Sequence, residues 1–174
     1  AMNGKSNTKF TNVRFGNIAW STGSVFPIWK EMLEHSGQIK TTGPHMRRFF
    51  FQVSEAAELV ITAMNKIEVT AGKVLSRKMK AAQIEDILMQ FINVYGGKYD
   101  KVAERPGESI DETLIGISEL NYAREIELDN YPHYIISFNE KTEKSFPDIL
   151  TSANAERLTN EEILKIIKNP PIFL

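Results

Sequence analysis

The sequence of 174 residues contains no cysteine, which excludes disulfide scaffolding, thiol catalysis and cysteine-based metal sites. It also lacks an excess of one charge: 21 Lys and Arg stand against 22 Asp and Glu, for a formal net charge of −1. Proteins that bind the phosphate backbone usually carry a basic excess, so we expect no nucleic-acid partner. The three histidines, His35, His45 and His133, lack metal-ligand spacing, so we expect no metal site.

Long apolar runs are missing as well. No stretch approaches the roughly 20 residues that span a bilayer, and no basic-then-apolar signal segment opens the chain. We therefore expect no membrane span and a cytoplasmic location. There is also no glycine-rich loop between a strand and a helix, so the chain by itself has no dinucleotide-binding fingerprint.

The hydrophobic pattern alternates between strand and helix periods, which predicts an α/β layered fold. Strands are expected at 10–16, 38–42, 48–53, 73–76, 99–104 and 134–138. Helices are expected at 25–35, 54–66, 82–95 and 118–126, with a last one after Thr159.

Local signals refine these elements. Ser54 is the expected N-cap of the second helix, whose apolar residues cover most of its circumference and predict extensive burial. The phenylalanines at 49–51 are expected in the core. Thr159 and Glu162 have capping-box spacing, and Pro170 forbids continuation of the last helix.

Three short stretches combine glycine, arginine and hydroxyl or amide side chains, at 14–25, 42–49 and 104–108. Each lies at or just beyond an expected strand end, where open α/β sheets bind ligands. Arginine offers donors that match phosphate oxygens, and backbone N–H groups entering the helix at 23–25 suit an anion. Taken singly, each stretch also has a plainer reading, as a turn, a surface arginine beside an apolar strand, or a loop before a helix.

Carboxylates give no catalytic pair. The Glu55/Glu58 and Glu161/Glu162 pairs lie at helix starts, where acidic side chains favour the helix dipole. Asp111 and Glu112 are expected to be solvated rather than catalytic. No residue of this chain is therefore assigned to catalysis.

The order of the motifs resembles a known family. VRFGN, GSVFPIWKEML, TGPHMRRFF running into SEAAELVITAM, and ERPGESIDETLI follow one another as in the C-terminal half of the UDP-N-acetylglucosamine 4,6-dehydratases. These enzymes form part of the polysaccharide-biosynthesis branch of the extended short-chain dehydrogenases. The resemblance runs from about residue 9 to about residue 112, and more loosely to the C-terminal helix.

The resemblance implies a lyase that makes 4-keto-6-deoxy nucleotide sugars for surface glycans, with NADP or NAD in the full-length parent. The substrate-binding residues that it implies are Asn17, Ser24, Val25, Thr42, Arg48, Arg105 and Glu108. Arg48 and Arg105 would grip the diphosphate beside Asn17, and Glu108 would hold the ribose.

The chain departs from the family pattern at four positions. Thr22 stands where arginine is usual, Arg47 where threonine is usual, and Ser109 where lysine is usual, while Trp20 is bulkier than the usual residue. We expect these changes in the nucleotide pocket, with Arg47 compensating for a lost positive charge. They leave the base and the sugar open.

The family's glycine-rich cofactor loop and catalytic motifs are absent. Residues 1–174 are thus expected to be one substrate-binding portion of an extended short-chain dehydrogenase fold, lacking most of the Rossmann half, with 1–20 at the edge of the missing sheet. We expect this portion alone to be inactive and to bind no cofactor. An exposed edge at 13–15 predicts a homo-oligomer. A nucleotide-sugar epimerase portion and a non-catalytic nucleotide-sugar-binding module remain alternatives.

Overall fold

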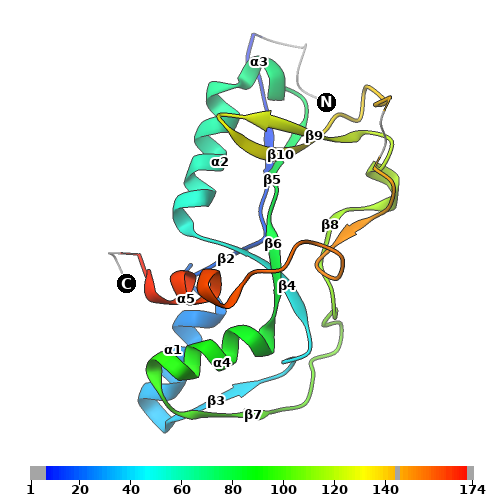
Figure 1. Cartoon of the computed structure of the whole chain (residues 1–174). Coiled ribbons are helices and arrows are strands. Elements are labelled where there is room, and N and C mark those ends of the chain that lie inside the picture. Colours follow the sequence, from blue (N-terminus) through cyan, green and yellow to red (C-terminus); the bar gives the residue numbers. More distant parts are fainter. Residues whose placement is uncertain (1–6, 144–145, 172–174) are drawn as a thin grey trace. The chain divides into compact units, whose positions relative to one another are not determined.

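A computed structural model describes residues 7–143 and 146–171 of the chain (Figure 1). The chain divides into two compact units, each with a sheet and a hydrophobic cluster of its own. The first unit consists of the described residues within 1–15, 54–78 and 113–150. The second unit consists of the described residues within 16–53, 79–112 and 151–174. That the whole chain forms a single domain stays a prediction.

The first unit contains a four-stranded sheet with the order β1-β5-β10-β9. Its strands are β1 (Asn12–Arg14), β5 (Val74–Arg77), β10 (Tyr131–Ile136) and β9 (Ala123–Leu128). β1 runs parallel to β5, whereas β10 is antiparallel to both of its neighbours. β1 therefore occupies one edge of this sheet, and it covers the middle of the expected 10–16 strand.

The hairpin of β9 and β10 corrects the expected helix at 118–126, which is wrong. Only a 3-10 turn, η1 (Ile117–Glu119), precedes β9. Asp129 and Asn130 connect the two strands with φ values of 52° and 66°. Such left-handed values fit a two-residue hairpin turn of the type favoured by Asn and Asp. This Asp-Asn pair between two apolar stretches was the available signal for the hairpin.

Helix α2 (Val53–Asn65) packs only one face against the sheet of the first unit. Leu59 and Ala63 join strand residues in one cluster, whereas Ile61 and Met64 are 55% and 64% exposed. The expectation of a helix buried over most of its circumference is therefore wrong, because its apolar residues occupy two faces and the sheet covers one. Ser54 is not the N-cap either, since the helix already includes Val53.

Among its described residues, the second unit is built from three helices and two small sheets. The helices are α1 (Val25–Ser36), α4 (Ile84–Tyr95) and α5 (Asn160–Lys168). One sheet has the order β2-β4-β6, from β2 (Asn17–Ile18), β4 (Arg47–Phe51) and β6 (Lys80–Gln83). The other pairs β3 (Gln38–Thr41) with β7 (Lys98–Lys101) in parallel. The remaining short elements of the chain are α3 (Ile67–Thr70), β8 (Thr113–Ile115) and β11 (Leu150–Thr151).

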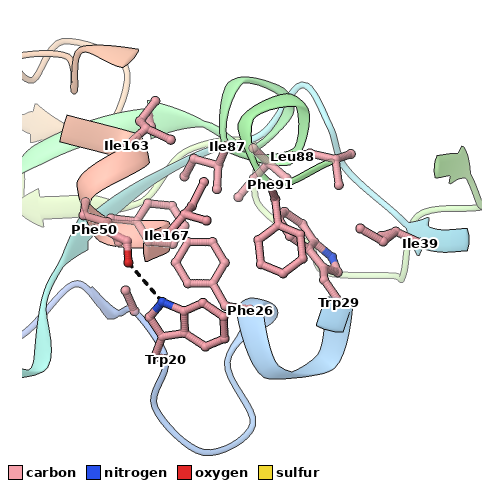
Figure 2. Packing of buried hydrophobic residues seen from close by; sticks show 14 of the residues in the cluster. Trp20, Phe26, Trp29, Ile39, Phe50, Ile87, Leu88, Phe91, Ile163 and Ile167 are labelled. Carbon is pink, nitrogen blue, oxygen red and sulfur yellow. Dashed lines mark hydrogen bonds between the residues drawn. The ribbon is translucent and has the colours of Figure 1, made fainter. Parts of the chain in front are cut away.

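Aromatic side chains fill the core of the second unit (Figure 2). Phe26 of α1 stacks on Phe91 of α4 with ring centroids 5.7 Å apart, and Trp29 meets the same Phe91 edge-on at 5.5 Å. Such aromatic pairs add stabilisation beyond the area that they bury. Phe50 of β4 belongs to this cluster, and residues 49–51 are all buried, so the expectation of a core role is confirmed.

Most of the other expected elements are confirmed within a few residues, including α1, α4 and the capping box of Thr159 and Glu162 in α5. Strand β6 was missed. Its central residues, Ala81 and Ala82, favour a helix locally but pair with β4 at 0% and 2% exposure. The tertiary contact thus overrides the local preference.

Candidate functional site

Six of the seven expected substrate-binding residues line one cavity in the second unit. They are Asn17, Ser24, Val25, Thr42, Arg48 and Glu108. The cavity has a volume of about 260 Å³, close to the lower end of the range for small-molecule sites. Arg105 does not line it but contacts a residue that does. Whether these residues bind a substrate stays a prediction.

Asn17 enters the cavity wall from β2, where the chain passes very close to β4. A Cβ atom on the preceding Gly16 would lie 2.7 Å from the Cβ of Phe49, so only glycine fits there. The Asn17 amide Nδ2 donates to the backbone oxygen of Phe49 at 3.0 Å and to the Glu112 carboxylate at 2.9 Å. These bonds fix the orientation of the amide.

The start of α1 forms a second part of the wall. Gly23 has φ of 77°, and Ser24 occupies the N-cap position in an extended conformation without a side-chain capping bond. The Ser24 Oγ is buried and has no hydrogen-bond partner among the described residues. A buried polar atom without a partner calls for an explanation, and the nearby N–H groups of the first helical turn favour an anion.

Glu108 closes the third part of the wall. Its carboxylate accepts hydrogen bonds from the Arg105 backbone N–H and the Thr42 hydroxyl, each at 3.0 Å. These contacts lower the pKa of Glu108. The hydrogen bond from the Arg105 N–H has the largest effect, and the Thr42 hydroxyl and the charges of Arg105 and Arg48 add to it. The segment 104–108 and the end of β3 are thereby joined, and both arginines act electrostatically on one carboxylate.

The Arg48 guanidinium faces the segment that follows Glu108. Its Nη1 donates to the backbone oxygen of Arg47 at 2.8 Å and of Ile110 at 3.1 Å, and its Nη2 donates to that of Ser109 at 2.8 Å. Its Nε lies 3.6 Å from the Glu112 carboxylate. Arg48 thus holds the 109–112 segment against β4, and a contact with a diphosphate stays a prediction.

The expectation that Asp111 and Glu112 are simply solvated is wrong. Asp111 accepts two hydrogen bonds from the Arg47 guanidinium at 2.6 Å each, and this pairing lowers the pKa of Asp111. The buried Ser152 hydroxyl bonds to the Asp111 carboxylate and to the Glu112 backbone N–H, at 3.0 Å each. Glu112 also accepts from the Phe49 backbone N–H at 3.0 Å.

None of the four departures from the family pattern lines this cavity, so their effect on a nucleotide pocket stays a prediction. The Arg47 charge is paired with Asp111. Trp20 is 4% exposed and packs in the aromatic core, where its indole N–H donates to the Ile166 oxygen at 3.0 Å. Thr22 is exposed, and Ser109 contributes its backbone oxygen to Arg48.

The junctions that lead into α1 and α2 lack a glycine-rich dinucleotide loop. The loop into α1 contains one glycine, Gly23, and α2 follows β4 across Gln52 alone, with no glycine between them. A dinucleotide loop needs several glycines at this kind of junction, so that the backbone can approach the pyrophosphate. We therefore assign no hydride-transfer chemistry to these residues.

Two further searches concern metals and membranes. Within 7–143 and 146–171, no group of three or more His, Cys, Asp or Glu side chains is placed to hold a metal ion. Among the helices of the described chain, none combines the length and apolar character that a membrane crossing requires.

The fold is that of the extended short-chain dehydrogenases, in agreement with the expected α/β class. The X-ray structure of Pen from Bacillus thuringiensis matches with a TM-score of 0.82 and 28% identity, over 97% of this chain and 51% of that chain. The structure of TunA, described as an NAD-dependent NDP-hexosamine 5,6-dehydratase of tunicamycin biosynthesis, matches with a TM-score of 0.51 over 62% of this chain and 36% of its own. At 14% identity, the likeness to TunA concerns the fold alone.

The chain belongs to the polysaccharide biosynthesis protein family, which matches residues 1–133. It is 32% identical over 174 residues to the uncharacterized membrane protein MJ1061 of Methanocaldococcus jannaschii, covering 95% of this chain and 51% of that protein. It is 32% identical over 170 residues to the capsular polysaccharide biosynthesis protein CapD of Staphylococcus aureus, covering 92% and 27%. It is 27% identical over 181 residues to a UDP-glucose 4-epimerase of Rickettsia bellii, covering 97% and 52%. The chain therefore spans about half the length, or less, of these curated relatives.

Proposed function

We propose that the chain is the substrate-binding portion of a nucleotide-sugar 4,6-dehydratase that acts on UDP-N-acetylglucosamine in surface-polysaccharide biosynthesis. The observation that carries this proposal is the convergence of Asn17, Ser24, Arg48 and Glu108, from separate parts of the sequence, on one cavity. Membership of the polysaccharide biosynthesis protein family supports it.

The cavity offers chemistry for each part of such a ligand. The Arg105 charge, which acts on the Glu108 carboxylate, supplies positive charge for a diphosphate, and the N–H groups at the start of α1 add to it. The buried Ser24 hydroxyl gains a partner when a phosphate oxygen reaches it. Glu108 is an ionised carboxylate near neutral pH, with its pKa lowered further by the Arg105 backbone N–H, and it accepts hydrogen bonds from ribose hydroxyls.

Catalysis requires groups that these residues do not supply. In our proposal the longer parent enzyme holds NADP or NAD and the acid-base residues elsewhere in its sequence, and the 174-residue chain binds substrate without turning it over. Turnover of UDP-N-acetylglucosamine by the purified chain with added NADP would contradict this.

Calorimetric titration of the chain with UDP-N-acetylglucosamine, UDP, GDP and TDP tests the binding. We expect the UDP ligands to bind and an Arg105→Ala variant to weaken them. Arg124→Ala, which removes an exposed arginine of β9 outside the cavity, is the matched control and should leave the affinity unchanged. Failure of every nucleotide to bind would overturn the proposal.

An epimerase portion is the second candidate, favoured by the similarity to the UDP-glucose 4-epimerase of Rickettsia bellii. Preferential binding of UDP-glucose over UDP-N-acetylglucosamine would support it. A non-catalytic sugar-nucleotide module is the third, and a natural gene product of this length, measured by mass spectrometry, would support that one.

We also propose that the chain forms a homo-oligomer in the cytoplasm. The edge position of β1 and the exposed apolar side chains of α2, including Ile61 and Met64, support association. Size-exclusion chromatography with light scattering tests it, and a monomer at high concentration would count against it.

A further inference from the structure

The Asn17 side chain has a fixed polarity in the cavity wall. Its Nδ2 has two hydrogens, and they serve the Phe49 backbone oxygen at 3.0 Å and the Glu112 carboxylate at 2.9 and 3.0 Å. Both partners are acceptors, so reversing the amide would place oxygen against oxygen. The Oδ1 is therefore the side-chain atom that Asn17 can offer to a ligand.

Glu112 is the residue that sets this polarity. One of its oxygens accepts from both the Asn17 amide and the Phe49 backbone N–H, which ties the carboxylate to β4. Its backbone N–H donates to the buried Ser152 hydroxyl at 3.0 Å, which fixes the main chain as well. The carboxylate also brings a negative charge to within hydrogen-bond distance of Asn17.

This polarity disfavours a phosphate beside Asn17. A diphosphate diester has no proton to donate near neutral pH, so an amide oxygen cannot bond to it. The charge of the Glu112 carboxylate is paired with Arg48 at 3.6 Å, so it is the orientation of the amide that disfavours the phosphate. A hydroxyl or amide N–H, in contrast, can donate to Oδ1.

We propose that Asn17 recognises the sugar, by accepting a hydrogen bond from a hydroxyl or N-acetyl N–H group, and that Glu112 is its positioning residue. This inference rests on the proposed function and differs from the diphosphate contact that the family resemblance implies for Asn17. In this arrangement the positive charge of Arg105 attracts the diphosphate, and Asn17 binds the sugar of the same ligand.

The test compares UDP with UDP-N-acetylglucosamine as calorimetric probes for Asn17→Ala. Loss of one neutral hydrogen bond weakens UDP-N-acetylglucosamine by about three- to tenfold and leaves UDP within about twofold. Arg105→Ala, the matched control, weakens both probes by the same factor. If alanine at 17 prevents folding, Asn17→Ser keeps a small polar side chain there but cannot place an oxygen at the Oδ1 position, and is expected to show the same selectivity.

Glu112 variants test the positioning role, because a purely structural defect would not weaken UDP-N-acetylglucosamine more than UDP. Glu112→Ala should give the same sugar-selective loss. Glu112→Gln should restore only part of the affinity, because its amide oxygen can accept from both Asn17 and Phe49 while its NH2 group meets the Asn17 NH2 where the second carboxylate oxygen lay. Equal weakening of UDP and its sugar by Asn17→Ala would place Asn17 at the diphosphate and overturn the inference. Absence of binding of both probes to the unsubstituted chain would instead overturn the proposed function on which it rests.

Discussion

The bond between Trp20 and α5 gives the sharpest stability prediction. The indole N–H of Trp20 donates to the backbone oxygen of Ile166 at 3.0 Å, and both residues are buried. In a helix that oxygen normally accepts from the N–H four residues later, but residue 170 is proline and has none. Trp20 thus supplies a donor that the sequence denies to α5 (Figure 2).

Trp20→Phe removes this donor and part of the ring volume. Leaving a buried carbonyl without a partner costs about 1–3 kcal/mol, and the lost volume adds a cavity term. Trp29→Phe is a matched control for volume, because Trp29 is 3% exposed in the same cluster and its indole N–H has no hydrogen-bond partner among the described residues. We expect Trp20→Phe to lower the free energy of unfolding by about 1–3 kcal/mol more than Trp29→Phe does.

Equilibrium unfolding in urea, followed by far-ultraviolet circular dichroism, measures this difference without relying on tryptophan emission. The linear dependence on denaturant gives the free energy of unfolding for each variant. Equal destabilisation of the two variants, within about 0.5 kcal/mol, would show that the Trp20 bond contributes nothing and would refute the reasoning.

Three further predictions concern stability. Gly16→Ala should destabilise the protein by about 1–3 kcal/mol in thermal unfolding, because its Cβ would lie 2.7 Å from that of Phe49; an unchanged melting temperature would contradict this. The Arg14 hydrogen bond lowers the pKa of Glu119, so this pair stabilises the fold above the ordinary glutamate pKa and loses that effect as pH falls through the lower folded-state value. Arg14→Met should therefore reduce stability at neutral pH and flatten its decline in acid, and an unchanged acid limb would argue against the pair. Thr159→Ala should cost about 1 kcal/mol in urea unfolding by removing the cap of α5, with no loss expected from a change at exposed Arg124.

The residues of the candidate site that belong to short sequence motifs could be predicted from the order of those motifs along the chain. The Gly-Asn, Ser-Val, Thr-Gly and Arg-Pro-Gly-Glu stretches lie at strand or helix ends, and the fold brings residues from each toward one cavity. Residues such as Glu112 were not predictable in this way. A carboxylate beside a turn looks solvated in sequence, and its partner Asn17 lies 95 positions away.

The sequence alone determined the strongly periodic helices and the cap of α5, because each of these signals lies within a few residues. It also indicated the protein family, through short motifs that follow one another along the chain. Tertiary structure decided which polar groups meet. The Trp20 bond to Ile166 spans 146 positions, and the polarity of the Asn17 amide depends on acceptors from β4 and the 109–112 segment. Local periodicity reports which side of an element is buried, whereas a hydrogen bond between distant residues depends on how the elements pack against each other.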